Sequence, residues 1–150
     1  MKITIAWIGK TKEPAIASLT EEYVKRNSRY VLIEGRPVRD ETALLEISGR
    51  SSTTKVKPKS TLILMDSRGK EFTSELFASF LGDYQDRNPL PLVFAIGGAD
   101  GFSDVTRAAA QQIISLGKIT LAHELARVVL LEQIYRAFTI LKGHPYHSGH

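Results

Sequence analysis

Hydrophobic residues along this chain alternate between two spacings. Short apolar or alternating runs are typical of strands, whereas hydrophobic residues three and four positions apart are typical of helices. The first spacing predicts a strand with Ile3, Ile5 and Trp7 that stops at Gly9, and strands at residues 31–34, 61–65, 92–96 and 118–121. The second predicts helices that begin at Pro14, cover residues 42–47, begin at Thr73 or Ser74, run from Ser103 or Asp104 to about Ile114, and run from about Glu124 to Leu141. Strands and helices in alternation indicate an α/β fold with a mainly parallel sheet flanked by helices.

Polar segments separate these elements. Residues 48–60 contain Gly49, Pro58 and a run of four Ser and Thr, which predict a flexible loop. Residues 66–70 predict a turn directly after the third strand. At 150 residues the chain has the size of one domain, which we expect to cover residues 1–150.

The composition excludes several classes of protein. The chain has no cysteine, so it forms neither a disulfide scaffold nor a thiolate zinc site, and it has no cysteine nucleophile. No apolar run reaches the roughly 20 residues that a membrane-spanning helix needs. The first residues lack the apolar block of a signal peptide. We therefore expect a cytoplasmic protein that does not span a membrane.

Positive charge is concentrated in the first 60 residues. This part holds 12 Lys and Arg against seven Asp and Glu, whereas residues 61–150 hold eight against nine. A basic half fits contact with a polyanion such as RNA, and it equally fits charges that only solvate helix faces. The basic residues that a polyanion would contact include Lys10, Lys12, Lys25, Arg26 and Arg29.

The predicted last helix is apolar on most of its sides. Its hydrophobic residues are Leu125, Val128, Val129, Leu130, Leu131, Ile134, Phe138 and Leu141. Such a helix has to be covered on more than one face, and a single sheet covers only one. The pattern therefore predicts a second subunit against this helix. Arg127 and Arg136 interrupt the apolar surface, and we expect them to reach out at a subunit edge or to face a polar substrate.

Two glycine-containing turns lie next to predicted strands. Gly97, Gly98 and Gly101 follow one strand, and Gly117 precedes another. Glycine lets the backbone turn sharply and lets a ligand approach closely, and ligands of open α/β sheets bind at the carboxyl ends of strands. The spacing matches neither a dinucleotide fingerprint nor a phosphate loop. The turns fit a slot for a flat heterocycle such as adenine, with Met65 as an apolar wall, and they also fit ordinary tight turns.

The last seven residues contain three of the four histidines, at positions 144, 147 and 150. A metal site needs histidines held on one rigid face, which a terminal segment does not provide. The tail is then either a frayed end or a segment that carries an aromatic side chain and imidazoles into an active site. His123, at the start of the last helix, fits a structural role. The chain has no nucleophile elbow, no His-Glu-x-x-His and no acidic pair typical of a hydrolase.

Four segments taken in order resemble one protein family. They are residues 94–101 (FAIGGADG), 115–121 (SLGKITL), 127–137 (RVVLLEQIYRA) and 144–147 (HPYH). Together they resemble the ribosomal RNA large-subunit methyltransferase H family of the SPOUT class, whose members methylate N3 of a pseudouridine in bacterial 23S rRNA with S-adenosylmethionine. The resemblance covers essentially the whole chain. It implies a SPOUT-type fold with a C-terminal trefoil knot, a homodimer, and 23S rRNA of the ribosome as substrate.

The resemblance also implies roles for individual residues. The S-adenosylmethionine pocket would consist of Met65, Gly97, Leu116, Gly117, Lys118, Ile119, Thr120 and Leu121. The catalytic residues would be Tyr146 and His147 in the tail, with Arg127, or Arg136, helping to hold the rRNA. No metal would take part. The alternative is a non-catalytic ribosome-binding or assembly factor that kept the fold, and a nucleotide-binding oxidoreductase is disfavoured because the dinucleotide spacing is missing.

Overall fold

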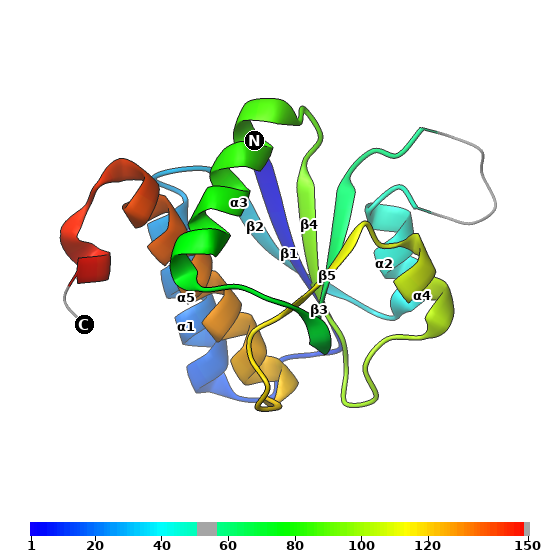
Figure 1. The fold of residues 1–150 in the computed structure, drawn as a ribbon. Coiled ribbons are helices and arrows are strands. Elements are labelled where there is room, and N and C mark those ends of the chain that lie inside the picture. Colours follow the sequence, from blue (N-terminus) through cyan, green and yellow to red (C-terminus); the bar gives the residue numbers. More distant parts are fainter. Residues whose placement is uncertain (51–56, 149–150) are drawn as a thin grey trace.

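The structure, a computed structural model, describes residues 1–50 and 57–148, without the side chains of residues 147 and 148. Strands and helices alternate along most of the chain (Figure 1). The strands are β1 (Lys2–Ile8), β2 (Leu32–Val38), β3 (Thr61–Glu71), β4 (Leu92–Ile96) and β5 (Gln112–Ser115). The helices are α1 (Pro14–Asn27), α2 (Glu41–Ile47), α3 (Ser74–Arg87), α4 (Asp104–Ala109), α5 (His123–Lys142) and the short 3-10 helix η1 (Pro145–Ser148).

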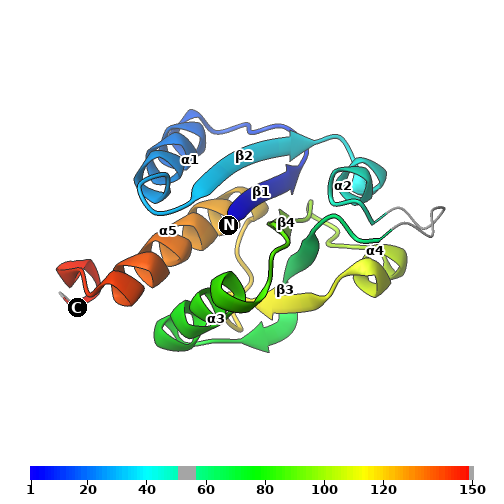
Figure 2. The same ribbon diagram turned by 90° about the horizontal axis from the view of Figure 1, so that it is seen from above.

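The five strands form one parallel sheet in the order β2-β1-β4-β3-β5. β4 lies in the centre and all of its residues are buried, which explains its unbroken apolar sequence Leu-Val-Phe-Ala-Ile. Helices α1, α3 and α5 cover one face of the sheet, and α2 and α4 cover the other (Figure 1 and Figure 2). The predicted α/β fold with a parallel sheet and flanking helices is therefore confirmed.

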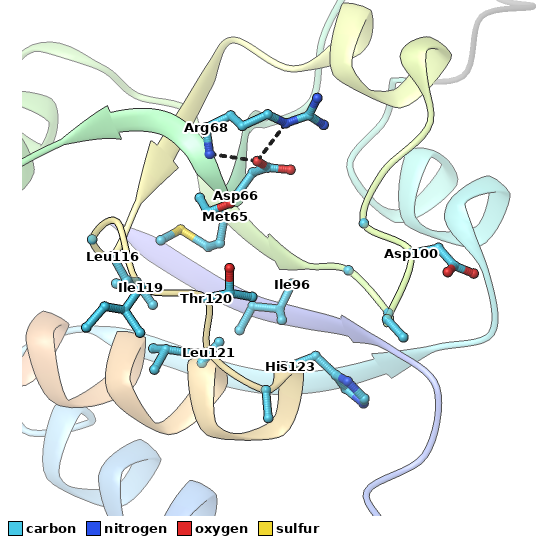
Figure 3. Close-up of a pocket in the computed structure, with 18 of the residues that line it drawn as sticks. Met65, Asp66, Arg68, Ile96, Asp100, Leu116, Ile119, Thr120, Leu121 and His123 are labelled. Atoms are coloured by element: carbon cyan, nitrogen blue, oxygen red, sulfur yellow. Dashed lines mark hydrogen bonds and ion pairs between the residues drawn. The ribbon is translucent and has the colours of Figure 1, made fainter.

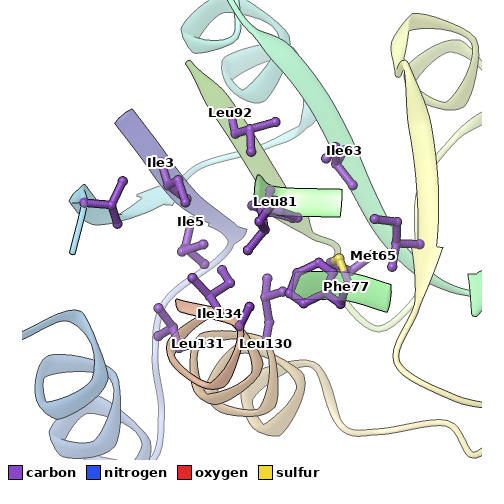
Figure 4. Packing of buried hydrophobic residues seen from close by; sticks show 14 of the residues in the cluster. Ile3, Ile5, Ile63, Met65, Phe77, Leu81, Leu92, Leu130, Leu131 and Ile134 are labelled. Atoms are coloured by element: carbon purple, nitrogen blue, oxygen red, sulfur yellow. The ribbon is translucent and has the colours of Figure 1, made fainter. Parts of the chain in front are cut away.

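The larger part of the core lies between the sheet and helices α3 and α5 (Figure 4). Phe94 from β4, Leu81 from α3 and Leu130 from α5 are all fully buried there. Asn27, at the end of α1, is also buried, and its Nδ2 donates to the carbonyl oxygen of Leu131 at 3.1 Å. This hydrogen bond fixes α1 against α5, because a buried polar group that loses its partner costs about 1–3 kcal/mol of stability.

The prediction of one helix from residue 103 or 104 to about 114 is wrong. Helix α4 ends at Ala109, and Gln112–Ser115 form β5 beside β3. The alanines at the end of α4 favour a helix, whereas the β-branched Ile113 and Ile114 favour a strand. Ile114 is buried in the sheet, so tertiary packing decides between these two local preferences.

Two further predictions at the sheet edge are wrong. Residues 118–121 form a loop rather than a strand, because the backbone leaves the sheet at Gly117, which has a φ of 139°. β3 does not end in a turn at residues 66–70 but continues to Glu71, with an irregular register beyond Met65. In both cases the reason is β5, which occupies the edge of the sheet and pairs with the added length of β3.

The predicted flexible loop at residues 48–60 falls in part on residues 51–56, which lie outside the described residues. The described residues on either side are fixed to each other. Ser60 is buried and donates from its hydroxyl to the carbonyl oxygen of Ser48 at 2.6 Å. Arg50 donates to the carbonyl oxygen of Ser60. The two ends of this segment therefore belong to the folded body.

Helix α5 lies between α1 and α3 on the same face of the sheet (Figure 2). These neighbours cover flanks of the helix that the sequence pattern assigned to a second subunit. Leu125 and Leu141, near its two ends, remain exposed. Neither α5 nor any other described helix combines the length and the hydrophobicity needed to cross a membrane.

Gly69 marks a point where β3 and β5 approach closely. A Cβ atom at Gly69 would lie 2.6 Å from the carbonyl carbon and oxygen of Ile113, which are backbone atoms and cannot rotate away. We expect Gly69→Ala to lower the free energy of unfolding by about 2–3 kcal/mol, measured by urea denaturation. Gly98→Ala is the matched control, because a Cβ there meets no atom within 4 Å. An unchanged unfolding midpoint for Gly69→Ala would contradict this account of the contact.

Candidate functional site

A pocket of about 510 Å³ opens at the carboxyl ends of β3 and β4, beside the loop after β5 and the start of α5 (Figure 3). Ligands of open α/β sheets bind at this end of the strands, and the volume is in the range of small-molecule sites. Seven of the eight predicted pocket residues line it: Met65, Gly97, Leu116, Gly117, Ile119, Thr120 and Leu121. Lys118 belongs to the same loop but is exposed and is not among the lining residues. The two glycine turns of the sequence thus meet at one site.

Glycines shape the wall formed by residues 97–102, here called the glycine loop. A Cβ at Gly98 would meet no atom within 4 Å, and Gly98 lines the pocket. Gly97 is buried instead, and a Cβ there would come within 3.3 Å of the backbone of Gly101. The N–H of Gly101 donates to the carbonyl oxygen of Gly98 at 3.1 Å. The glycine loop is therefore tight within itself and open toward the pocket.

Residues 116–121 form the facing wall of the pocket. Ser115 closes its first turn, because the Ser115 hydroxyl donates to the carbonyl oxygen of Gly117 at 2.7 Å and accepts from the Gly117 N–H at 3.0 Å. Among the described residues, no protein hydrogen bond involves the backbone groups of residues 118–121. Ile119 adds apolar surface, with 82% of its area exposed. Unpaired backbone donors and acceptors beside apolar side chains suit a flat polar heterocycle.

An ion pair between Asp66 and Arg107 joins β3 to α4, next to the glycine loop. Asp66 also accepts from the backbone N–H of Arg68 at 2.8 Å (Figure 3), and Arg107 Nε donates to the carbonyl oxygen of Phe102 at 3.3 Å. Burial tends to raise the pKa of Asp66, but the hydrogen bonds from Arg68 and Arg107 outweigh it and hold this pKa below its ordinary value. Both residues line the pocket, and the sequence interpretation missed them. The available signal was an acidic residue directly after the buried part of β3.

The lowered pKa of Asp66 predicts an effect of pH on stability. The carboxylate stabilises the fold above its unfolded pKa of about 3.9, and this contribution disappears as the pH falls through the lower folded value. We expect Asp66→Asn to lower the free energy of unfolding by about 1.5–3 kcal/mol at pH 7, and by much less at pH 2, measured by urea denaturation at both values. Asp86→Asn is the control, because Asp86 is exposed on α3. An equal loss at both pH values would contradict the assignment.

The far end of the glycine loop is fixed by α2. Glu41, in the first turn of α2, accepts from both the backbone N–H and the hydroxyl of Ser103 at 2.9 Å. Ser103 is the N-cap of α4, and its hydroxyl accepts from the N–H of Thr106. The C-terminal end of the glycine loop is therefore held twice, by Arg107 at Phe102 and by Glu41 at Ser103, before any ligand arrives.

Arg127 lies inside the chain and does not line the pocket. Only 1% of its area is exposed, its Nη1 donates to the hydroxyl of Thr11 at 2.7 Å, and its guanidinium lies 3.8 Å from the ring centroid of Trp7. Burial lowers the pKa of Arg127. The expectation that Arg127 reaches out at a subunit edge or faces a substrate is wrong, because this side of α5 faces the loop between β1 and α1. There the cation–π contact with Trp7 stabilises the buried charge.

Tyr146 lies against the middle of α5. Its hydroxyl donates to Glu132 Oε1 at 3.1 Å, and the same oxygen accepts from Arg136 Nη2 at 2.6 Å. The Tyr146 ring meets the Tyr135 ring edge-on, with centroids 4.8 Å apart. Burial raises the pKa of Tyr146 far above its ordinary value, and the charge of Glu132 acts in the same direction, so Tyr146 is a neutral hydrogen-bond donor. The side chain of His147 lies outside the described residues.

The predicted basic residues form two groups at opposite ends of α1. Lys10 and Lys12 precede the helix and are exposed. Lys25 and Arg26 occupy its last turn, and Arg29 follows it. A helix of this length separates its ends by about 20 Å. These five residues therefore form two positive regions rather than one patch.

His123, for which the sequence indicated a structural role, is partly buried. It lines the pocket at the first residue of α5 (Figure 3). Within residues 1–50 and 57–146, no three His, Asp or Glu side chains gather in a way that could hold a metal ion. The pocket offers backbone groups, the carboxylate of Asp66 paired with Arg68 and Arg107, the carboxylate of Asp100, and the imidazole of His123.

Comparisons with known proteins place this chain among methyltransferases. A family model described as a predicted SPOUT methyltransferase matches residues 1–147. A protein from Koribacter versatilis, named ribosomal RNA large subunit methyltransferase H, is 54% identical over 150 residues, which cover all of both chains. A protein of the same name from Geobacter metallireducens is 42% identical over 154 residues, covering 99% of this chain and all of the relative.

Two solved structures share the fold at low sequence identity. A probable methylase family protein from Haemophilus influenzae has a TM-score of 0.62 at 14% identity, covering 96% of this chain and 69% of that one. A probable methyltransferase from Bordetella pertussis has a TM-score of 0.61 at 9% identity, covering 90% of this chain and 93% of that one. At these identities the similarity concerns the fold alone.

Proposed function

Because the chain belongs to the ribosomal RNA large subunit methyltransferase H family of SPOUT methyltransferases, we propose that it transfers the methyl group of S-adenosylmethionine to N3 of a pseudouridine in 23S rRNA. The observation that carries this proposal is the 54% identity, over the full length of both chains, to a relative of that name. The position of the pocket is the second support, because seven of the residues that the resemblance assigned to the methyl donor line it. Such a substrate places the protein in the cytoplasm.

The pocket lining fits S-adenosylmethionine. The unpaired backbone groups of residues 118–121 suit the donor and acceptor edge of adenine, and Met65 and Leu116 offer apolar contact to its ring. Gly98 leaves the space that a side chain would fill. When bound, the cofactor supplies an electrophilic methyl group. The chain itself has to hold the target base and to manage the proton that leaves it.

The tail supplies the groups for that proton. The N3–H of pseudouridine is a weak acid, so methylation needs a base or a positive charge that stabilises the developing anion. His147 is the candidate general base, since histidine is the side chain that most often takes this role. Tyr146, kept neutral by its raised pKa, donates a hydrogen bond. Arg136 supplies the positive charge in place of the buried Arg127, and its hydrogen bond with Glu132 raises its pKa.

The tail of one copy acts at the pocket of a second copy. No described tail residue is among those that line the pocket, and Tyr146 is bound to the middle of its own α5. A homodimer brings the two parts together, and the exposed side chains of Ile119 and Leu125 offer apolar surface for its interface. The C-terminal trefoil knot that the resemblance implies is part of the same proposal.

Methyl incorporation tests the proposed function. The protein is incubated with radiolabelled S-adenosylmethionine and either ribosomes that lack the modification or naked 23S rRNA. We expect label in the 23S rRNA, at a pseudouridine N3 located by mass spectrometry of nuclease fragments. Tight ribosome binding without label would favour the alternative of a non-catalytic binding or assembly factor. Calorimetry with NAD beside S-adenosylmethionine excludes or supports an oxidoreductase.

The basic residues predict a salt dependence of ribosome binding. If Lys10 and Lys12 contact phosphates, the affinity falls about 10-fold or more between 50 and 200 mM salt, because counterions are released on binding. Substituting both lysines by alanine should weaken binding and flatten this dependence, measured by filter binding over a salt series. Arg87→Ala is the control, because it removes an exposed positive charge at the end of α3, outside the two basic groups around α1. An affinity for ribosomes that does not change with salt concentration would exclude contacts of Lys10 and Lys12 with phosphates.

A further inference from the structure

We infer that Glu132 is a positioning residue. It holds Tyr146 of the tail and Arg136 of α5 in one fixed arrangement. The inference rests on the proposed function, because it assigns a role in the methyl transfer to a residue that does not line the cofactor pocket. Glu132 acts through its neighbours. It is the only side chain that binds both Tyr146 and Arg136 by hydrogen bonds among the described residues.

Both oxygens of the Glu132 carboxylate accept hydrogen bonds from neighbouring side chains. Its Oε1 accepts from Arg136 Nε at 3.0 Å, from Arg136 Nη2 at 2.6 Å and from the Tyr146 hydroxyl at 3.1 Å. Its Oε2 accepts from Gln133 Nε2 at 2.8 Å. Only 20% of the side-chain area of Glu132, and of Arg136, is exposed. An ion pair this far from solvent keeps its geometry better than an exposed pair on a helix.

Glu132 is itself held from the opposite side. Gln133, which donates to Glu132, accepts at its Oε1 from the hydroxyl of Ser74 at 2.7 Å. Ser74 begins α3, and both it and Gln133 line a second cavity of about 210 Å³ that shares Met65 and Leu116 with the main pocket. A continuous chain of hydrogen bonds thus runs from Ser74, at the second cavity, to Tyr146 in the tail. This chain fixes the carboxylate relative to the body of the protein.

The tail turn is fixed on its other sides as well. Gly143 ends α5 with a φ of 70°, and the N–H of His144 donates to the carbonyl oxygen of Thr139 at 2.9 Å. The Arg136 guanidinium lies 5.1 Å from the centroid of the Tyr146 ring, the Tyr135 ring meets that ring edge-on, and Tyr23 also contacts Tyr146. The described part of the tail is therefore anchored and not a frayed end. The Tyr146 hydroxyl and the Arg136 guanidinium are therefore fixed in position before a target base arrives.

Pre-organised groups raise the rate of the chemical step rather than the affinity for cofactor. We therefore expect Glu132→Gln to lower kcat on ribosomes about 10-fold, with the Kd for S-adenosylmethionine unchanged within two-fold. Glu22→Gln is the matched control, because Glu22 and Arg26 form the same i,i+4 pair on α1, with Nε and Oε1 2.8 Å apart. This control should leave kcat unchanged.

A double substitution tests whether Glu132 acts through Tyr146. In a Tyr146→Phe protein, Glu132→Gln should lower kcat further by clearly less than it does in the wild type, because the Tyr146 contact is already lost and only the contact with Arg136 remains to be changed. The phenol of Tyr146, followed by the ultraviolet difference between wild type and Tyr146→Phe, should ionise at lower pH in the Glu132→Gln protein. This optical titration needs no activity, so it supports or contradicts the contact directly.

Three results overturn the inference: a wild-type kcat for Glu132→Gln, losses of kcat that multiply in the double variant, or a melting temperature lowered by more than about 10 °C, which would make Glu132 a residue of the fold. Failure of the proposed function looks different. In that case the wild-type protein itself incorporates no methyl group into ribosomes, whatever residue stands at position 132.

Discussion

Methyl transfer to ribosomes falls roughly 100-fold or more when Tyr146→Phe and His147→Ala are combined, because general acid–base groups contribute at least this much to such reactions. The affinity for S-adenosylmethionine stays the same, because the two side chains act on the target base and every residue that lines the pocket is unchanged. Single-turnover methylation at saturating cofactor and ribosomes measures the first quantity, and calorimetry measures the second.

The matched control for the tail is Tyr30→Phe. The Tyr30 ring stacks on Phe138 with centroids 5.9 Å apart, so this variant also removes one hydroxyl from an aromatic contact of α5 but leaves Tyr146 in place. It should methylate at the wild-type rate. If the combined tail variant also does so, the tail has no catalytic role and the proposed mechanism is wrong.

Gly98→Leu should strongly weaken the binding of S-adenosylmethionine. Gly98 is not in the left-handed region, and a Cβ there meets no protein atom within 4 Å, so the new side chain enters the pocket without straining the backbone. We expect the Kd for S-adenosylmethionine to rise about 100-fold, or roughly 3 kcal/mol, with little change in melting temperature. Ala17→Leu on the exposed face of α1 controls for an added leucine.

Mixing the two variants tests the shared site. If a tail serves the pocket of the other copy, a heterodimer of Gly98→Leu with the combined tail variant contains one site that has both an intact pocket and an intact tail. Activity should therefore return on mixing two inactive proteins. If each copy used its own tail, every site in the mixture would carry a defect, and no activity would return.

The interior of the sheet could be predicted from the sequence because its signal is strong and local. The unbroken apolar run of β4 and the helical repeat of α3 gave elements of the right type. The edge could not be predicted in the same way. The alanine-rich end of α4 and the short segment Gln112–Ser115 carry opposite local preferences, and only pairing with the extended part of β3 favours the strand.

The candidate site also contains residues that a local sequence signal indicated and residues that depend on contacts between distant segments. The glycine turns indicated the pocket because glycine marks backbone that a ligand approaches. Asp66 and Arg107 were missed, since they lie 41 positions apart and their pairing depends on how the loops fold over the sheet. Arg127 misled for a related reason. An arginine in an apolar helix suggests a surface or a substrate, and nothing in the local pattern shows that Trp7 will cover it.

The two walls of the pocket differ in their freedom. The glycine loop is fastened by Arg107 and Glu41, whereas residues 118–121 have no internal backbone hydrogen bonds. Changes that break the contacts of Arg107 or Glu41 therefore threaten the fold, while changes in residues 118–121 mostly alter what the pocket accepts. Evolution of a new preference among related ligands, or its engineering in the laboratory, has its easiest route through these four residues.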